Sequence, residues 1–499
     1  MLDAPPASRQ RSARSMTETR RVIPIEPAAE DNGGLFSLYQ AHQKIYPRAV
    51  AGTFARLRWV TVIFTQLIFY GLPWLTWNDR QAVLFDLQAR KFYLFGVVLW
   101  PQDFIYLAGL LIVAALSLFF FTAVAGRLWC GYACPQTVYT EIFMWIERKV
   151  EGDRFARIRL DGEEWPWSFK KWRLKITKHA LWIAIALWTG FTFIGYFTPI
   201  KELSANILAF SLGPWQTFWL FFYSFATWGN AGFMREQVCK YMCPYARFQS
   251  VMVDKDTFVV TYDKMRGEPR GSRNKSENQV QKGLGDCVDC SICVQVCPTG
   301  IDIRDGLQYM CIGCGACIDA CNQVMNKMRY PKGLVRYTTE RAMLNRESNQ
   351  SARSHLFRPR ILIYSSIIFV LTSVFLFSLF TRNPLRVDVM RDRGALAREV
   401  DGRYIENVYR IQLMNSSESP MRVAVKATGL PDIAVLDAGG KVIHSVVIAP
   451  ASNLLIPVKV SVVINEVISG SHPIQFEFRG LEGEQIRSRD EKSSFIVPR

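Results

Sequence analysis

Five uncharged, apolar runs alternate with polar and mostly basic segments along the chain. Each run is about as long as the roughly 20 residues that an α-helix needs to cross a bilayer, and none contains Asp, Glu, Lys, Arg or His. The runs cover residues 59–77, 104–126, 181–200, 215–234 and 361–380. They predict a five-span transmembrane bundle. Because the spans carry no charge and no His, a pump, an ion channel and a bundle-bound haem with His ligands are all disfavoured.

The pattern changes after the fifth run, where short β-branched segments alternate with turn signals such as SSESP, DAGG and SGSHP. This alternation predicts an all-β immunoglobulin-like sandwich of roughly seven strands. A partner-docking role and a stabilising cap are both open for this module. The stretch KFYLFGVVLWPQDF at 91–104 fits either an interfacial helix or a partial re-entrant segment.

Charge gives the predicted spans an orientation. The chain of 499 residues has a net charge of +17, and all 14 Trp lie between Trp59 and Trp228. Lys and Arg concentrate before the first span and in the segments 127–178 and 235–360, and such basic segments stay on the cytoplasmic side of a membrane. The C-terminal module is therefore expected in a bacterial periplasm, on the far side of the inner membrane. Because the orientation in a membrane accounts for the basic segments, the positive net charge does not indicate a nucleic-acid partner.

The predicted organisation has five parts. They are a disordered cytoplasmic tail at 1–56, a four-span membrane core at 57–250, a cytoplasmic ferredoxin-like domain at 251–355, a fifth transmembrane helix at 356–382 and the periplasmic sandwich at 383–499. All 12 Cys precede Asn322, so every thiol falls in or beside a segment assigned to the reducing cytoplasm.

Eight of these thiols form two runs of the spacing CxxCxxCxxxC, which is typical of a ferredoxin with two [4Fe-4S] clusters. In such proteins the fourth Cys of each run binds the other cluster. One cluster is therefore predicted on Cys287, Cys290, Cys293 and Cys321, and the second on Cys311, Cys314, Cys317 and Cys297. A zinc site is the alternative, although zinc needs only four thiolates. The second run departs from the usual pattern because Asn322, and not Pro, follows Cys321.

The other four thiols form a repeated CxxxCP motif after the second and fourth spans, at Cys130 and Cys134 and at Cys239 and Cys243. Residues at i and i+4 share a helix face, so each pair is expected to point the same way at the membrane surface. Four converging thiolates suit a third redox centre or a soft metal such as Cu(I), with Met234 and Met242 nearby. Buried, unreactive thiols are the alternative. His179, at the expected start of the third span, is a candidate ligand or proton donor, although such a His is more often interfacial.

These features together resemble the CcoG/FixG/RdxA family of cytochrome c oxidase accessory proteins, from about Leu57 onward. The CxxxCP repeat is also similar to membrane ferredoxins of nitrate and nitrous-oxide reductase systems, which lack such a C-terminal module. The resemblance implies a cupric reductase that supplies Cu(I) to a cbb3-type oxidase. It also implies that Cys130, Cys134, Cys239 and Cys243 handle the copper.

Three functions remain open. The first is the copper reductase, fed by an unidentified cytoplasmic electron donor. The second is an electron-transfer subunit that oxidises quinol, and the third is an assembly scaffold that grips oxidase subunits or copper-delivery proteins. The sequence leaves the oligomeric state open, with a homodimer as one option.

Overall fold

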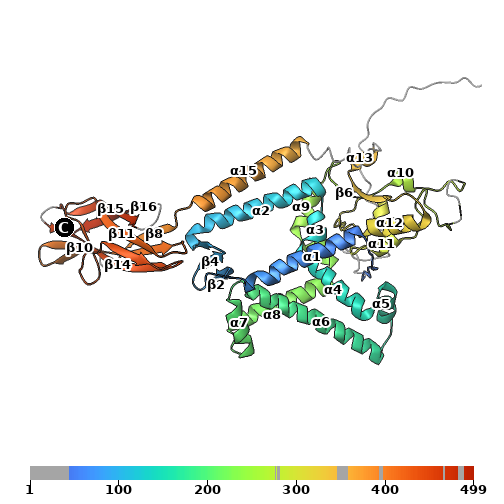
Figure 1. Ribbon diagram of the computed structural model, residues 1–499, viewed down its shortest axis with the longest axis horizontal. Helices are drawn as coiled ribbons and strands as arrows, with labels where there is room; N and C mark the ends of the chain where they lie inside the picture. The colour runs from blue at the N-terminus through green and yellow to red at the C-terminus, as the bar shows by residue number, and fades with distance from the viewer. Residues whose placement is uncertain are drawn as a thin grey trace, which may run out of the picture. The chain divides into compact units, whose positions relative to one another are not determined.

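A computed structural model describes residues 44–275, 277, 281–344, 358–392, 397–464, 467–481 and 488–498. Five long helices in the described ranges overlap the five predicted spans (Figure 1). They are α1 (Thr53–Gly71), α2 (Phe104–Ala125), α6 (Phe169–Ile194), α8 (Pro214–Gly229) and α15 (Pro359–Thr381). Within the described ranges two helical stretches, Pro101–Ala125 and Pro359–Thr381, are long and apolar enough to cross a membrane. The five-span bundle therefore stays a prediction.

The other three helices differ from the predicted spans for identifiable reasons. α1 includes Arg56 and Arg58, and α6 begins 12 residues before the apolar run, at Phe169, so its first turns carry Lys and Arg. α8 has only 16 residues and passes into a π-helical turn, η3 (Asn230–Met234). Helical hydrogen bonding continues into charged sequence, so helix bounds and apolar bounds do not coincide.

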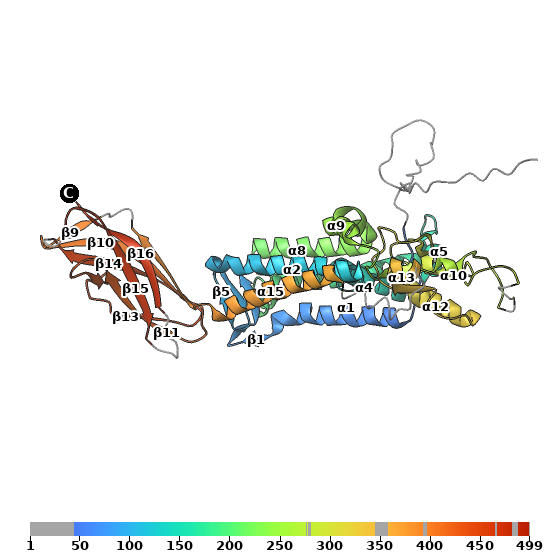
Figure 2. The ribbon, with the colours of Figure 1, turned by 90° about the horizontal axis from the view of Figure 1, so that it is seen from above.

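Small residues set the closest approaches between the long helices. Figures 1 and 2 show α15 beside α2, and a Cβ atom at Gly109 would lie 3.0 Å from the Phe375 ring. α6 packs along α8, where a Cβ at Gly190 would lie 2.6 Å from the Leu220 carbonyl oxygen. Such close packing is how helices associate where the surroundings are as apolar as their side chains.

In the stretch between α1 and α2, residues 91–104 do not form the interfacial helix that was one of the two alternatives, and the partial re-entrant segment stays a prediction. A 3₁₀ turn, η1 (Leu72–Trp74), leads into short strands, and η2 (Pro101–Asp103) precedes α2. The strands are β1 (Thr76–Trp77), β2 (Arg80–Gln81), β3 (Val83–Asp86), β4 (Lys91–Leu94) and β5 (Val97–Leu99). β3, β4 and β5 form an antiparallel sheet that turns at Phe95 and Gly96. Aromatic and β-branched residues favour this outcome.

Shorter helices connect the long ones, and several of them contain or follow the two CxxxCP motifs. They are α3 (Leu128–Tyr132), α4 (Pro135–Glu151), α5 (Arg154–Asp161), α7 (Ile200–Leu208), the π-helical turn η4 (Val238–Met242) and α9 (Pro244–Met252). Pro135 and Pro244 each occupy the first turn of the following helix, where a missing backbone N–H costs nothing. α4 ends at Gly152, whose φ of 92° suits glycine.

The region with the eight ferredoxin thiols is built on one strand pair. β6 (Val259–Tyr262) pairs antiparallel with β7 (Val335–Thr338). Between and beside them lie α10 (Lys264–Gly267), α11 (Ile292–Gln295), η5 (Ile303–Asp305), α12 (Ala316–Met328) and α13 (Glu340–Leu344). α11 and α12 start after the left-handed residues Ser291 and Gly315, so a tight turn precedes each helix.

The predicted disordered tail is wrong for its last residues. Residues 45–52 form neither helix nor strand but are bonded to the core: Arg48 N–H donates to the Gln295 carbonyl at 2.8 Å, and Ala49 N–H donates to the Asp153 carboxylate at 3.1 Å. α1 then begins at Thr53. The backbone amides of Arg48 and Ala49 thus have hydrogen-bond partners far away in the chain, which sequence patterns do not reveal. Residues 1–43 of the tail lie outside the described residues.

The C-terminal module is a sandwich of two antiparallel sheets, as predicted, with nine strands among its described residues. One sheet has the order β12-β14-β10-β8, with β9 also on β10, and the other has the order β13-β11-β15-β16. The strands are β8 (Leu385–Arg391), β9 (Arg398–Val400), β10 (Tyr404–Asn415), β11 (Met421–Thr428), β12 (Ala434–Leu436), β13 (Ser445–Ile448), β14 (Asn453–Val463), β15 (Gly470–Gly480) and β16 (Ser488–Val497). The sequence did not reveal β8, β9 and β16, in part because the first half of β16, SRDEK, is charged.

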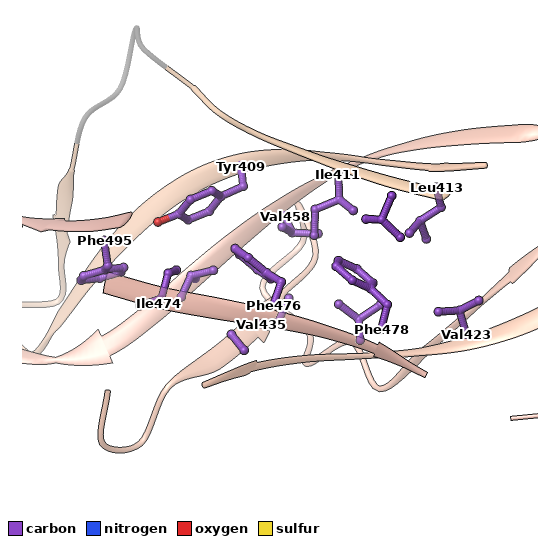
Figure 3. Close-up of a cluster of buried hydrophobic side chains, with 14 of the residues drawn as sticks. Tyr409, Ile411, Leu413, Val423, Val435, Val458, Ile474, Phe476, Phe478 and Phe495 are labelled. Atoms are coloured by element: carbon purple, nitrogen blue, oxygen red, sulfur yellow. The ribbon is translucent and has the colours of Figure 1, made fainter. Parts of the chain in front are cut away.

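Buried aromatic rings hold the two sheets together (Figure 3). Tyr409 of one sheet meets Phe476 of the other edge to face at 5.2 Å. The Tyr409 hydroxyl crosses the sandwich and donates to the Ser494 carbonyl at 2.8 Å, which satisfies its polar tip inside the core. The core therefore uses Tyr and Phe in place of the Trp and disulfide of antibody domains.

Candidate functional site

The eight ferredoxin thiols lie around two small cavities. Cys287, Cys290, Cys293 and Cys321 line the first, beside Tyr262 and Arg304. Cys297, Cys311, Cys314 and Cys317 line the second, and Cys293 also reaches its wall. The fourth Cys of each run thus lies with the first three of the other run, and the two cavities are neighbours.

This donor set fits two [4Fe-4S] clusters. Eight thiols in two groups of four around adjacent cavities are the arrangement that two exchanged CxxCxxCxxxC runs predict, whereas one zinc ion needs only four thiolates. Burial raises the pKa of Cys293, Cys311 and Cys321 to about 12. A positively charged metal centre is what would hold these thiols as thiolates.

The Asn that replaces Pro in the second run has a structural reason. Cys321 lies inside α12, which continues to Met328, and a Pro in that position would remove a helical hydrogen bond. The Asn322 side chain instead accepts a hydrogen bond from Gly333 N–H at 2.9 Å. It therefore fixes the loop that leads to β7.

The four CxxxCP thiols come together, although not on continuous helix faces as predicted. Cys130 lies in α3 and Cys239 in the π-helical turn η4, while Cys134 and Cys243 have extended backbone and start the next helices. The pKa of Cys239 is raised to about 12 by burial and by the other three thiols. The proline after each second Cys breaks the helix, which explains the departure. Met234 and Met242 are more than one-third exposed.

Gly131 brings the first CxxxCP motif against the second thiol cavity. A Cβ atom at Gly131 would lie 2.7 Å from the Ile312 carbonyl oxygen and 3.1 Å from Cys314 N. The neighbouring Tyr132 hydroxyl donates to the Cys314 carbonyl at 3.3 Å, and Cys130 packs on the apolar cluster that contains Cys314. Backbone contact without an intervening side chain makes this a short path between the two groups of thiols.

Arg127 places a positive charge between the thiol groups. Its charge lowers the pKa values of Cys130, Cys239 and Cys311, although the burial of these thiols outweighs that effect. The guanidinium donates to the Ala246 carbonyl at 2.6 Å and covers the Tyr309 ring at 4.7 Å. The sequence analysis missed this residue. Its signal would have been a basic residue immediately before the first CxxxCP motif.

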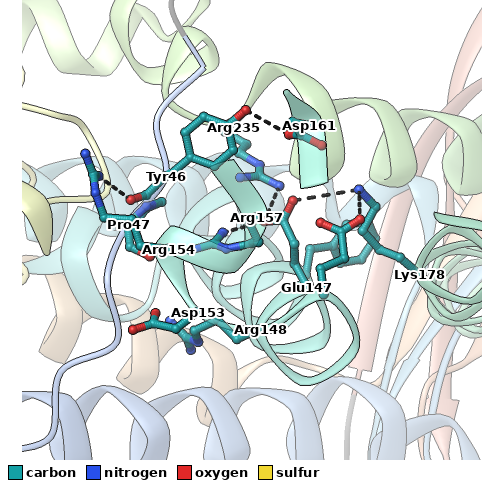
Figure 4. Close-up of polar contacts among 12 residues, drawn as sticks. Tyr46, Pro47, Glu147, Arg148, Asp153, Arg154, Arg157, Asp161, Lys178 and Arg235 are labelled. Atoms are coloured by element: carbon teal, nitrogen blue, oxygen red, sulfur yellow. Dashed lines mark hydrogen bonds and ion pairs between the residues drawn. The ribbon is translucent and has the colours of Figure 1, made fainter. Parts of the chain in front are cut away.

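A buried ion cluster supports the second CxxxCP motif (Figure 4). Glu147 on α4 pairs with Arg157 at 2.9 Å, with Arg235 at 3.0 Å and with Lys178 at 3.8 Å. Arg235 begins the segment that leads to Cys239, and its carbonyl also accepts from the Gln136 amide at 3.0 Å. The sequence analysis missed this cluster too, although Glu147 and Glu151 recur at helical spacing.

His179 lies in the middle of α6 and not at its start. Its ring stacks on Phe233 at 5.8 Å and meets Trp182 edge to face at 5.1 Å. Its Nδ1 atom is buried without a hydrogen-bond partner among the described residues, and the role of ligand or proton donor stays a prediction.

Comparison with known proteins agrees with this arrangement. Family models match at residues 234–340, described as a 4Fe-4S dicluster domain, at 107–151, described as a 4Fe-4S binding domain, and at 375–498, described as an IG-like fold at the C-terminal of FixG, putative oxidoreductase. The chain is 39% identical to nitrogen fixation protein FixG of Rhizobium meliloti over 434 residues, which cover 81% of this chain and 82% of that protein. It is 41% identical to protein RdxB of Cereibacter sphaeroides over 407 residues, covering 80% and 85%.

More distant likenesses cover parts of the chain. Ferredoxin-type protein NapH of Haemophilus influenzae is 21% identical over 229 residues, which cover 44% of this chain and 67% of that protein. The crystal structure of a FixG-related protein from Vibrio parahaemolyticus matches 23% of this chain and 97% of its own, at 23% identity and a TM-score of 0.20.

Proposed function

This chain belongs to the family of FixG, RdxA and RdxB, and on that premise we propose that it reduces Cu(II) to Cu(I) at the four CxxxCP thiols. As a member of the family with two matched iron–sulfur regions, it is an iron–sulfur electron-transfer protein. The finer proposal is that the Cu(I) serves the assembly of a cbb3-type cytochrome c oxidase, as the resemblance of the sequence implies.

The contact between Gly131 and the Cys314 segment carries the proposal. It puts Cys130 in the same apolar cluster as Cys314, so a copper ion at the CxxxCP thiols would lie beside the second thiol cavity. Bound [4Fe-4S] clusters supply electrons one at a time, and each Cu(II) needs one. Clusters and copper bound at these two groups of thiols would be neighbours, and such proximity is the main requirement for the transfer.

The CxxxCP thiols suit Cu(I) better than Cu(II). Soft thiolate and thioether ligands select the reduced ion, so binding at Cys130, Cys134, Cys239 and Cys243 favours reduction. Because burial raises the pKa of Cys130 to about 11 and that of Cys239 to about 12, copper binding must release protons. The charge of Arg127 favours their release. The four thiols would have to draw closer around one ion, since the described residues contain no preformed single-ion site.

The remaining parts of the proposal concern the membrane. We propose five transmembrane helices, with the ferredoxin-like domain in the cytoplasm and the sandwich in the periplasm of a bacterial inner membrane. Two apolar helices of spanning length support it, together with basic segments that suit the cytoplasmic side. In this arrangement the sandwich is available to oxidase subunits or copper-delivery proteins.

Removing one thiol from each CxxxCP motif is expected to reduce Cu(I) formation to the background rate. Wild type and Cys130→Ser/Cys239→Ser, each purified without oxygen in detergent and chemically reduced, would receive Cu(II) while cluster absorbance and a Cu(I) chelator are followed. The variant should keep its cluster absorbance before copper is added. If its clusters are oxidised by Cu(II) as fast as those of wild type, copper takes electrons without binding at these thiols. That result would favour the quinol-linked or the scaffold function over the copper reductase.

A third iron–sulfur cluster is the second candidate for the CxxxCP thiols, because the 4Fe-4S binding model matches across Cys130 and Cys134. Iron and sulfide analysis separates the candidates: two clusters give about eight iron atoms per chain and three give about twelve. With three clusters, Cys130→Ser/Cys239→Ser loses about one-third of the iron; with two it keeps all of it.

A further inference from the structure

A cavity of about 780 Å³ opens beside the second thiol group, and the electron-transfer proposal does not use it. It lies where the C-terminal end of α2 meets β6, β7, α13 and the loop before Cys311, and Cys311 itself is part of the wall. Its volume is typical of sites for small molecules and cofactors. The two thiol cavities are far smaller, so this one has room for a separate ligand.

The lining suits a flat, partly apolar ring. Tyr309 and Tyr337 line the wall. Apolar side chains at the rim remain unusually open to solvent: Leu307 is 55% exposed, Met265 64% and Leu344 65%. Exposed apolar side chains gathered around a hollow commonly mark a binding surface.

The charges around the cavity favour an anion. Its six charged side chains are Arg127, Lys255, Lys264, Asp254, Asp263 and Glu340. Asp254 is neutralised by Arg358 at 2.7 Å, and Asp263 by Arg336 at 3.3 Å. Within the part of the chain that the structure describes, the three cations of the lining have no carboxylate partner. Glu340 is the one carboxylate of the lining that no described cation neutralises, so the three cations outnumber it and the lining keeps an excess of positive charge, which concentrates anions.

We propose that this cavity binds a reduced flavin nucleotide, the electron donor that the sequence leaves unidentified. The isoalloxazine ring would lie against the tyrosines next to Cys311, and the phosphate would meet Lys255 and Lys264 at the rim. The proposal rests on the electron transfer argued above, but not on copper as the acceptor.

A flavin at this position also explains why two clusters are present. The reduced ring gives up two electrons and two protons and leaves as the oxidised flavin, whereas each cluster accepts one electron. Cys311 belongs to the second thiol group, and Cys293 lies on the walls of both thiol cavities. The chain can thus store both electrons and deliver them singly to a one-electron acceptor.

The test measures flavin binding first and electron transfer second. Full-length oxidised protein in detergent is titrated with flavin mononucleotide, with flavin fluorescence as the readout. The charge reversal Lys255→Glu/Lys264→Glu is expected to weaken binding about tenfold, as expected for two exposed ion pairs replaced by repulsion. The matched control is Lys327→Glu/Lys332→Glu, which reverses two exposed lysines outside the cavity lining and should leave binding unchanged.

The second measurement adds chemically reduced flavin mononucleotide without copper and follows cluster bleaching. The single substitution Leu307→Trp, which fills the rim of the cavity, should lower the rate of cluster bleaching by about the same factor as it lowers the affinity for the flavin. Equal binding by both charge-reversed proteins, or no saturable binding, would overturn the proposal. If a quinol reduces the clusters rapidly, and equally fast in wild type and in Lys255→Glu/Lys264→Glu, the proposal is overturned too, and the electron donor is a quinol in the membrane. The copper experiment is independent, since it starts from chemically reduced protein.

Discussion

Glu147→Gln is expected to lower the free energy of unfolding by about 3–5 kcal/mol, because it removes the negative charge that three buried cations in Figure 4 share. The Glu147 side chain is 1% exposed, and so is that of Arg157. Water cannot replace the lost carboxylate charge there. Lys178 keeps Glu151 as a partner at 2.9 Å, so Arg157 and Arg235 bear most of the loss.

Denaturant unfolding in detergent, followed by near-ultraviolet circular dichroism, measures this change. Glu164→Gln is the matched control, because Glu164 is exposed in the segment between α5 and α6, and it should change stability by less than about 0.5 kcal/mol. Since Arg235 leads into the second CxxxCP motif, Glu147→Gln should also slow Cu(I) formation. Equal stability of the two variants would show that the cations are solvated in the native protein.

Gly131→Val is expected to slow copper-dependent cluster oxidation by at least about tenfold, the effect of a 1.4 kcal/mol higher barrier. The new Cβ would lie 2.7 Å from the Ile312 carbonyl oxygen, so α3 and the Cys314 segment must separate. Overpacking of this kind costs about 1–3 kcal/mol of stability. Rapid mixing of reduced protein with Cu(II) gives the rate, and iron analysis shows whether the clusters remain.

Gly71→Val is the matched control, because no atom lies within 4 Å of a Cβ placed at Gly71. It should keep the wild-type rate. If Gly131→Val retains both its iron and the wild-type rate, electrons reach copper by a route that does not cross this contact, and the path argued from Gly131 is wrong.

The spans and strands show how far local pattern reaches in this chain. Most of each apolar run is helical, although α1 ends at Gly71 and residues 76–77 of the same run form a strand. The apolar runs 181–200 and 215–234 could not show that α6 extends back to Phe169 or that α8 stops at Gly229. α6 begins where the Ser168 side chain caps its first turn, and its lysines are held by partners on other elements, such as Glu151 for Lys178.

For the candidate site, the sequence by itself determined the number and grouping of the thiols. Spacings of two and three residues are local, so they identify the two ferredoxin runs and the CxxxCP repeat without any knowledge of the fold. Only the tertiary structure decided that Gly131 touches the Cys314 segment, that Arg127 faces both thiol groups and the large cavity, and that Glu147 holds Arg235. These contacts join segments dozens to nearly two hundred residues apart, and their partners are chosen by packing and charge once the chain has folded.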